Sequence, residues 1–406
     1  MRNEHISDAL NMVNDDIIEE ADAVRHRKQK HGKGWCKWAG VAACFAIIIY
    51  AAIWQLPQKK SDDLTQLPML HISEDTSSAM GFEGYLAYDV SELVNANPWN
   101  DNTELATLPV YENLLDYDEY FIAKGANLDE MREFLLEVAS RLGLNTDTLT
   151  ITDDVPDEEM QKKITEEFQA RGDTLPDGYF NPKILMAEEN GLKIEVDQAM
   201  TTAINFEPAV SLPSEYHFAY DATYEDMAAV AEYLGAEYKD LIGIEQPQVN
   251  ITGGDYTYDL HQGYTICFFD TSGSKTEQIL NYNFNQVAFY PDGEGKLFLA
   301  RIYHPDLSKK VGDYPIITSE EATKRLSEGH FITTVPYEMP GVEHVRKVEL
   351  IYRTGVFEEY YMPYYRFYIE IPELEENGLK TYGGYYVPAV EETYISNMPM
   401  WGESFH

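Results

Sequence analysis

The stretch TYEDMAAVAEYLG at residues 223–235 contains the signals of one complete amphipathic helix. Thr223 is a favoured N-cap residue, and Asp226 stands three positions later, where an acid completes a capping box. Apolar residues follow at helical spacing on one face: Met227, Val230 and Leu234. Gly235 stands where a left-handed C-terminal residue is expected. The stretch therefore predicts a capped helix whose apolar face needs another layer to cover it.

Two further stretches begin in the same way, at Asn127 and at Thr318, so the three starts recur at a period of about 95 residues. Each has an acid three positions after its cap, an apolar stripe, and a glycine after the stripe. A single capping box is a weak signal. Three of them at one spacing predict an internal repeat.

After each predicted helix the pattern changes to the alternation of β-strands, with glycine and proline turn signals between them. The expected strands are residues 149–152, 192–196 and 201–206, then 248–252, 264–269, 286–290 and 297–303, then 348–353, 364–371 and 385–390. The sequence thus predicts an α+β fold of repeated helix-plus-antiparallel-sheet units, with repeat 1 at 81–222, repeat 2 at 223–317 and repeat 3 at 318–406.

The run WAGVAACFAIIIYAAIW at residues 38–54 has no charged side chain and has a tryptophan at each end. With its flanks it predicts a transmembrane helix over residues 35–56, followed by a polar stalk over residues 57–80. A basic stretch precedes the run, so the positive-inside rule places the N-terminus in the cytoplasm and the repeats outside. A cleaved signal peptide and a lipoprotein modified at Cys44 are alternatives. The long segment before the run, and the apolar residues after Cys44, favour a single-pass anchor.

Residues 1–34 are the predicted cytoplasmic segment, and residues 6–24 within it have the periodicity of an amphipathic helix. One apolar stripe runs along this helix: Ile6, Leu10, Val13 and Ile17. Four acids lie largely off the stripe, which argues against a helix lying on anionic lipid. So short a tail has no domain to cover the stripe. We therefore expect it to bind a partner protein or a second copy of itself.

The chain has a formal net charge of −40, and nearly all of it lies beyond the predicted anchor. So acidic a region repels phosphate groups and anionic lipid, which excludes nucleic acid as a partner. It could attract cations or cationic peptides, but the sequence has no calcium-binding loop, and charge of this size also keeps a protein soluble.

Motifs of hydrolytic, phosphate-binding or metal centres are absent from the sequence, and residues 270–275 (DTSGSK) lack the spacing of a phosphate loop. The histidines are isolated from one another in the sequence, so they do not indicate a metal site. Pairs of adjacent acids are expected from the high content of Asp and Glu, so they do not indicate a catalytic pair. Cys267 is the only cysteine beyond the predicted anchor, so that region cannot form an internal disulfide. We expect no catalytic residue, no metal and no cofactor, and a protein that is not an enzyme.

Tyrosine is frequent, at 30 residues, and it clusters towards the C-terminus. Aromatic side chains beside a cation are common at binding surfaces, so one cluster supplies candidate ligand-binding residues: Tyr361, Tyr364, Tyr365 and Arg366. Tyrosine also suits half-buried strands, and residues 364–371 alternate between a mixed and an apolar face as an ordinary strand does. The sequence is consistent with both interpretations.

Two parts of the chain resemble known membrane proteins. Residues 1–21 (MRNEHISDALNMVNDDIIEEA) and 35–49 (WCKWAGVAACFAIII) resemble the start of membrane-anchored proteins of clostridial-type Gram-positive bacteria, some of which lie beside extracytoplasmic-function sigma factors. Residues 348–353 (VELIYR), 362–367 (MPYYRF) and 384–389 (GYYVPA) resemble the PepSY-related ectodomains of YycH and YycI type regulators. The resemblance implies a short anti-sigma-like tail, one membrane helix and an outer α+β repeat. It supplies no catalytic residues.

These observations favour a single-pass regulator or sensor of the cell membrane. Its outer region would bind an envelope ligand or protein, and its cytoplasmic helix would bind a sigma factor or a kinase. The alternative is an envelope-anchored binding module for a glycan or a protein, in which the helix only extends the anchor. The sequence does not identify the ligand.

Replacing two stripe residues together, Leu10→Asp and Ile17→Asp, is expected to abolish partner binding and to leave membrane insertion intact. Burial of the four stripe residues would contribute roughly 6–10 kcal/mol before the costs of ordering and association. Pull-downs from membranes that contain the wild type or the double variant measure the effect. Recovery of the same proteins by both would show that the stripe binds no partner.

Overall fold

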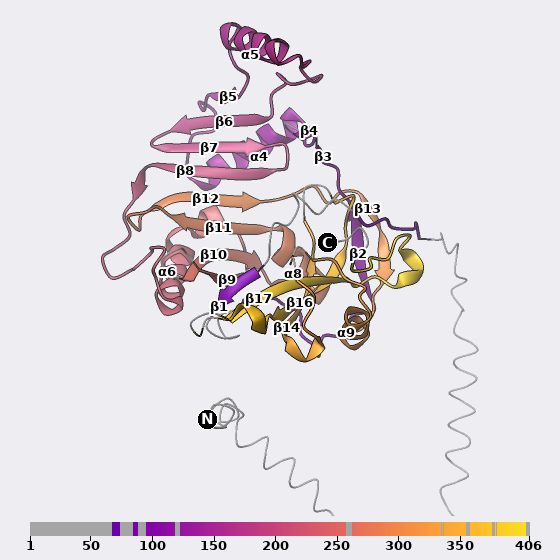
Figure 1. Cartoon of the computed structure of the whole chain (residues 1–406). Helices are drawn as coiled ribbons and strands as arrows, with labels where there is room; N and C mark the ends of the chain where they lie inside the picture. The colour runs from indigo at the N-terminus through magenta and orange to yellow at the C-terminus, as the bar shows by residue number, and fades with distance from the viewer. Residues whose placement is uncertain are drawn as a thin grey trace, which may run out of the picture. The chain divides into compact units, whose positions relative to one another are not determined.

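The computed structural model describes residues 67–73, 84–87, 95–117, 122–256, 262–333, 335, 337–354, 358–375, 378 and 380–402. The predicted cytoplasmic stripe and the predicted anchor at residues 35–56 lie outside these residues. Within the described ranges, no helix is both long enough and apolar enough to cross a membrane. The described residues form an α+β fold with mainly antiparallel sheets (Figure 1).

An eight-stranded antiparallel sheet is the largest element of the fold. Its strands, in spatial order, are β5 (Ile151–Asp153), β6 (Ile184–Glu189), β7 (Leu192–Asp197), β8 (Thr201–Val210), β12 (Leu297–Tyr303), β11 (Gln286–Pro291), β10 (Gln262–Asp270) and β9 (Pro247–Tyr256). Two four-stranded meanders, β5–β8 and β9–β12, therefore meet at β8 and β12, which lie side by side in Figure 1. The β6–β7 turn shows the local cause: Asn190 and Gly191 have φ of 53° and 77°, as a two-residue type I′ hairpin requires.

Two long helices, α4 (Leu128–Arg141) and α6 (Tyr224–Glu237), pack on one face of this sheet. Their apolar stripes and the inward side chains of the strands form one core, in which Val138, Val230 and Ile204 are fully buried. The strands alternate accordingly: Ile194 of β7 is buried in this core, whereas its neighbour Glu195 is only half-buried. Two more helices interrupt the meanders, α5 (Glu158–Arg171) and α8 (Lys275–Phe284), and the short α7 (Lys239–Ile242) follows α6 before β9.

The C-terminal part adds a four-stranded sheet, with the order β1 (Gly84–Ala87), β17 (Lys380–Pro388), β16 (Pro363–Glu370) and β14 (Val345–Tyr352). A three-stranded sheet has the order β13 (Lys310–Pro315), β2 (Thr107–Glu112) and β15 (Tyr360–Tyr361), and β3 (Asp116–Tyr117) pairs with β4 (Ile122–Lys124). The remaining elements are α9 (Ser319–Ser327) and the short 3₁₀ turns η2 (Val342–His344), η3 (Pro372–Leu374) and η4 (Glu392–Tyr394). Two further apolar cores lie among these elements, and both include residues of β16.

The three predicted helix starts are confirmed, because Asn127, Thr223 and Thr318 are the N-caps of α4, α6 and α9. The prediction that Gly235 ends the second helix is wrong, since α6 continues to Glu237. A Cβ at Gly235 would lie 3.1 Å from the ring of Phe268, so the glycine lets the helix approach strand β10 closely.

Sequence patterns missed several elements, among them β6, β13, α5 and α8. α8 begins in the stretch that lacked phosphate-loop spacing: Ser274 is its N-cap and forms a capping box with Glu277. A local helix start was therefore present there, but the following stripe was too short to show a period. The expected strand at 297–303 coincides with β12, and the other expected strands differ mainly at their ends.

The three predicted repeats interlock in the fold. Strands of the first two share the eight-stranded sheet, and β13 pairs with β2, which lies within the first predicted repeat.

Residues 67–73, expected within the stalk, instead pack on the C-terminal part: Leu70 and Ile72 are 0% and 1% exposed, and Leu70 forms a parallel bridge with Ile395. So short a segment has no periodicity, and only its tertiary partners reveal it as structured.

Thr223→Ala is expected to lower the free energy of unfolding by about 1 kcal/mol, because it removes the hydroxyl that accepts the Asp226 amide at the start of α6. Urea denaturation followed by circular dichroism measures the change. Thr174→Ala, in the exposed loop after α5, serves as the control and should have little effect. Equal stability of the two variants would show that the cap does not stabilise the fold.

Candidate functional site

The face of the large sheet opposite α4 and α6 is covered unevenly. At β10 it is covered by α8 and by the C-terminal part: the ring of Phe269 lies 5.3 Å from that of Tyr282 in α8, centre to centre, and both share a core with Ile351 of β14. Along β7, β8 and β12 several side chains on this face are half-buried or exposed, among them Glu195, Thr201 and Arg301. A groove formed by two adjoining pockets follows the border between the covered and the open part.

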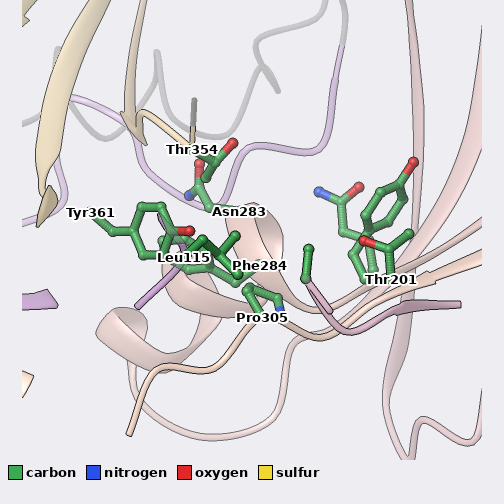
Figure 2. A pocket seen from close by; sticks show the side chains of 10 residues that line it. Leu115, Thr201, Asn283, Phe284, Pro305, Thr354 and Tyr361 are labelled. Atoms are coloured by element: carbon green, nitrogen blue, oxygen red, sulfur yellow. The ribbon is translucent and has the colours of Figure 1, made fainter. Parts of the chain in front are cut away.

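The first pocket, here called the neutral pocket, has a volume of about 350 Å³. Hydroxyl and amide side chains supply its polar surface: Thr201, Asn283, Gln286, Tyr303, Thr354 and Tyr361. Figure 2 shows Thr354, Asn283 and Tyr361 on one side and Thr201 on the other, with Leu115, Phe284 and Pro305 between them. The volume lies at the low end of the range for small-molecule sites.

The ten side chains that line the neutral pocket include no Asp, Glu, Lys, Arg or His. This composition stands out, because 25% of the residues of the chain are charged. A charged ligand group placed there would lose its hydration without gaining an ion pair, which is costly. The pocket therefore suits an uncharged, hydrogen-bonding group.

Hydrogen bonds hold the walls of the neutral pocket in place. The Asn283 amide group donates to the Ile279 carbonyl at 2.7 Å, and its Oδ1 accepts the Tyr352 amide at 2.9 Å. The Tyr361 hydroxyl donates to Oδ1 of Asn113 at 2.8 Å, and its ring lies 5.4 Å from that of Phe284. Side chains with fixed partners lose little freedom when a ligand binds, so the pocket is preorganised.

The second pocket, of about 370 Å³, shares Asn283, Gln286 and Thr354 with the neutral pocket and is also lined by Cys267 and Arg366. Burial raises the pKa of the Cys267 thiol to about 12. The thiol is therefore protonated at neutral pH, and it is not an activated nucleophile.

The structure separates the four predicted ligand-binding residues of the tyrosine cluster. Tyr361 and Arg366 line the groove. Tyr364 and Tyr365 are only 0% and 3% exposed, and the Tyr365 hydroxyl donates to the Ile317 carbonyl at 2.8 Å, so both belong to the cores instead. The mixed face expected for this strand is also covered, because β16 is buried along both faces.

The charge of Arg366 is used within the protein. Its Nη2 lies 2.6 Å from Oε2 of Glu349, and Nζ of Lys347 lies 2.6 Å from the other carboxylate oxygen. Asn95 also donates to this buried carboxylate. Burial alone would raise the pKa of Glu349, but the two cations hold it below its ordinary value. This cluster fixes β14 and β16 against the segment at Asn95.

Sequence reasoning missed most of the groove, because its residues come from segments far apart in the chain. The one local signal is the run NYNFNQ at residues 281–286, where amides alternate with aromatics at the end of α8 and contribute Asn283 and Gln286. Among the residues that the structure describes, no three His, Cys, Asp or Glu side chains gather where they could hold a metal ion. The predicted partner-binding residues of the cytoplasmic helix lie outside the described residues.

Comparison with known proteins gives no functional assignment. No family model and no curated protein matches the chain. Among solved structures, the crystal structure of an uncharacterized protein from Eubacterium rectale is similar at 14% identity and a TM-score of 0.28, over 70% of this chain and 84% of that one. Similarity at this level carries no information about function.

Glu349→Gln is expected to lower the free energy of unfolding at pH 7 by about 3 kcal/mol, because it leaves two cations facing a neutral amide. The folded-state pKa of Glu349 is lower than its ordinary value of 4.5, so its stabilisation is present above pH 4.5 and is lost as the pH falls through the lowered pKa. The gap between wild type and variant should therefore shrink in acid.

Urea denaturation at pH 7 and at acidic pH measures this gap. Glu294→Gln serves as the matched control, because Glu294 pairs with Lys296 while its side chain is 73% exposed, and such pairs contribute little. A gap for Glu349→Gln that does not change with pH would contradict the assignment.

Proposed function

We propose that the chain is a membrane-anchored sensor that is not an enzyme. The outer region binds an uncharged, hydroxyl- or amide-rich group of an envelope ligand in the groove. The bound state acts on the segment that leads to the predicted single-pass anchor. In this proposal the N-terminus lies in the cytoplasm, where the amphipathic helix binds a sigma factor or a kinase.

The lining of the neutral pocket supports the ligand class. Thr201 and Thr354 offer hydroxyls, and Gln286 offers an amide, so the walls can both donate and accept hydrogen bonds. Phe284 and Pro305 give apolar contact between them. Saccharides present hydroxyls together with apolar ring faces, and they match this mixture.

The observation that carries the sensor proposal is the packing of residues 67–73, here called the leading segment. The Leu70 amide donates to the Tyr394 carbonyl at 2.8 Å, and the Leu70 carbonyl accepts the Ser396 amide at 2.9 Å. The Ile72 amide donates to Oδ1 of Asn397 at 2.8 Å. The chain beyond the predicted anchor is thus bound to the C-terminal part, which also builds one wall of the groove.

Strand β15 joins the leading segment to the groove. The Glu359 amide, directly before β15, donates to Oγ of Ser73 at 3.0 Å. Two residues later, Tyr361 lines the neutral pocket. Residues 353–359 connect β14 to β15. In this connection the charged groups of Arg353 and Glu358 lie 2.9 Å apart, and their side chains are 1% and 2% exposed.

Removing either partner of so buried an ion pair costs several kcal/mol, so Arg353 and Glu358 stay together while the region is folded. Thr354 follows Arg353 and also lines the neutral pocket. A ligand between Thr354 and Tyr361 therefore contacts both ends of a connection that holds Ser73. Binding should stabilise this arrangement and hence the docked state of the leading segment.

The order of elements supports a repeated architecture for the outer region. α4 precedes β5–β8, α6 precedes β9–β12, and α9 precedes β14–β17, so each predicted repeat has a helix followed by antiparallel strands. In this proposal the three segments are copies of one PepSY-like unit, which explains the common N-caps at Asn127, Thr223 and Thr318. The membrane helix before them follows from the sequence alone.

An envelope-anchored binding module is the second candidate function, and it differs in one measurable respect. A module needs only the groove. In a sensor, a ligand in the groove must change the stability of the leading segment, since a ligand shifts only those equilibria whose two states it binds differently.

Amide hydrogen exchange on the full chain in lipid nanodiscs tests the proposal, with soluble glycan released from the envelope by a muramidase as the probe. Exchange at Leu70 and Ile72 should slow upon binding, by as much as about 100-fold at a ligand concentration of 100 Kd. Ala199→Trp, which fills the neutral pocket, should abolish the effect. Ala229→Trp, on the exposed side of α6, is the matched control and should behave as wild type.

Each outcome has one meaning. Binding that Ala199→Trp blocks, without any change of exchange in the leading segment, would replace the sensor by the binding module. Binding that Ala199→Trp does not affect would show that the neutral pocket is not the ligand site.

A further inference from the structure

We propose that a carboxylate-binding subsite centred on Arg301 lies beside the neutral pocket, so that the ligand of the groove is a saccharide bearing a carboxylate group. This inference rests on the proposed function, because it specifies the chemistry of the same ligand.

Arg301 lies near the middle of the open part of the large sheet. Its strand, β12, pairs with β8 on one side and with β11 on the other. The residues directly opposite Arg301 are Ala203 and Ala288, which are both small, and the Arg301 side chain is exposed. A ligand group can therefore approach the guanidinium from above the sheet.

Two tyrosines position the guanidinium. Cζ of Arg301 lies 5.7 Å from the ring centre of Tyr290, and the Tyr303 hydroxyl lies close enough to the guanidinium to interact with it electrostatically. The hydroxyls of Tyr290 and Tyr303 lie 3.3 Å apart. The cation–π contact with Tyr290 orients the cation, and most of its five N–H donors stay available.

Tyr303 connects this cation to the neutral pocket, because it also lines that pocket. Arg301 and Tyr303 stand two residues apart on one strand, so they share a face and their Cα atoms are separated by about 7 Å. A ligand whose neutral ring occupies the pocket can therefore bring an adjoining carboxylate to Arg301.

The nearby acids on this face have other partners, and Asp197 attracts the Arg301 guanidinium through space without forming an ion pair with it. Glu195 pairs with Lys193 at 2.8 Å. Oδ1 of Asp197 accepts the backbone amides of Ala199 and Thr201, both at 2.9 Å. Within the described residues, no carboxylate forms an ion pair with Arg301.

Five other arginines show the contrast, since each of them pairs with a glutamate: Arg141, Arg325, Arg346, Arg353 and Arg366. In a chain with a net charge of −40, an oriented and exposed arginine without such a partner can accept a carboxylate from outside. Arginine binds a carboxylate through two parallel N–H donors, which gives both affinity and direction.

The surroundings favour a carboxylate on a saccharide over a phosphate group and over a peptide. A phosphate dianion would be repelled by Asp197 and Glu195 more strongly than a single negative charge. An extended peptide would bind best by adding a strand, but β12 is bonded on both sides and has no free edge. Side chains such as Asn205 and Thr201 remain, and these suit sugar hydroxyls.

Calorimetric titration of the full chain in nanodiscs tests the subsite. The probes are disaccharides with one uronic acid and the same disaccharides after reduction of the carboxyl to a hydroxymethyl group. The wild type should bind the acidic set at least tenfold more tightly than the reduced set. Arg301→Gln should remove this preference and leave binding of the reduced set unchanged, and Arg301→Lys should give an intermediate preference.

Arg132→Gln, an exposed arginine on α4 on the other side of the sheet, is the matched control and should keep the wild-type preference. Equal affinity of the wild type for both sets, or equal losses for both sets in Arg301→Gln, would overturn the carboxylate subsite while the proposed groove stands. Binding to neither set, or binding that Ala199→Trp does not block, would overturn the groove itself. Tighter binding of matched phosphorylated sugars or acidic dipeptides would overturn the assignment to a carboxylated saccharide.

Discussion

Burial of one face of the large sheet under α4 and α6 is the constraint on which the other features of the molecule depend. The apolar stripes of both helices cover that side, so the opposite face of the same strands must be covered by other elements or meet solvent. Over β10 it is covered by Tyr282 of α8 and by the C-terminal part, whereas over β8 and β12 polar side chains meet solvent. The groove lies at the border between the covered and the solvent-facing part of this sheet face, where hydrogen-bonding side chains line it.

The C-terminal part is built to be rigid. Two buried or nearly buried ion clusters connect its strands, one at Glu349 and one at Arg353 with Glu358. Such clusters contribute less to net stability than apolar packing would, but they penalise any arrangement that separates the charges. A strand such as β15, held between these clusters and the leading segment, keeps its place until several contacts break together. In the proposed sensor, this cooperativity would couple the pocket to the leading segment.

Local signals in the sequence account for much of the secondary structure. Asn127, Thr223 and Thr318 cap helices as predicted, because a cap depends on residues within one turn. Strands such as β12 were visible because alternation is also local. Gly235 misled the helix boundary, since a glycine can end a helix or allow it close contact, and only the ring of Phe268 decides between the two. Tyr364 and Tyr365 were predicted as candidate ligand-binding residues. Tyrosine occurs both in strands with one exposed face and in strands buried on both faces, and β16 is of the second kind.

The sequence by itself determined the α+β class, the three helix starts, the strong negative charge and the lack of recognisable catalytic motifs, since each follows from composition or from neighbours along the chain. Only the tertiary structure decided that the first two meanders form one sheet, that residues 67–73 dock on the C-terminal part, and that Thr201, Asn283, Thr354 and Tyr361 face one pocket. The reason is physical. Helix caps, turns and strand alternation depend on residues that are close in the sequence. A pocket depends on surfaces that meet only after distant segments have packed.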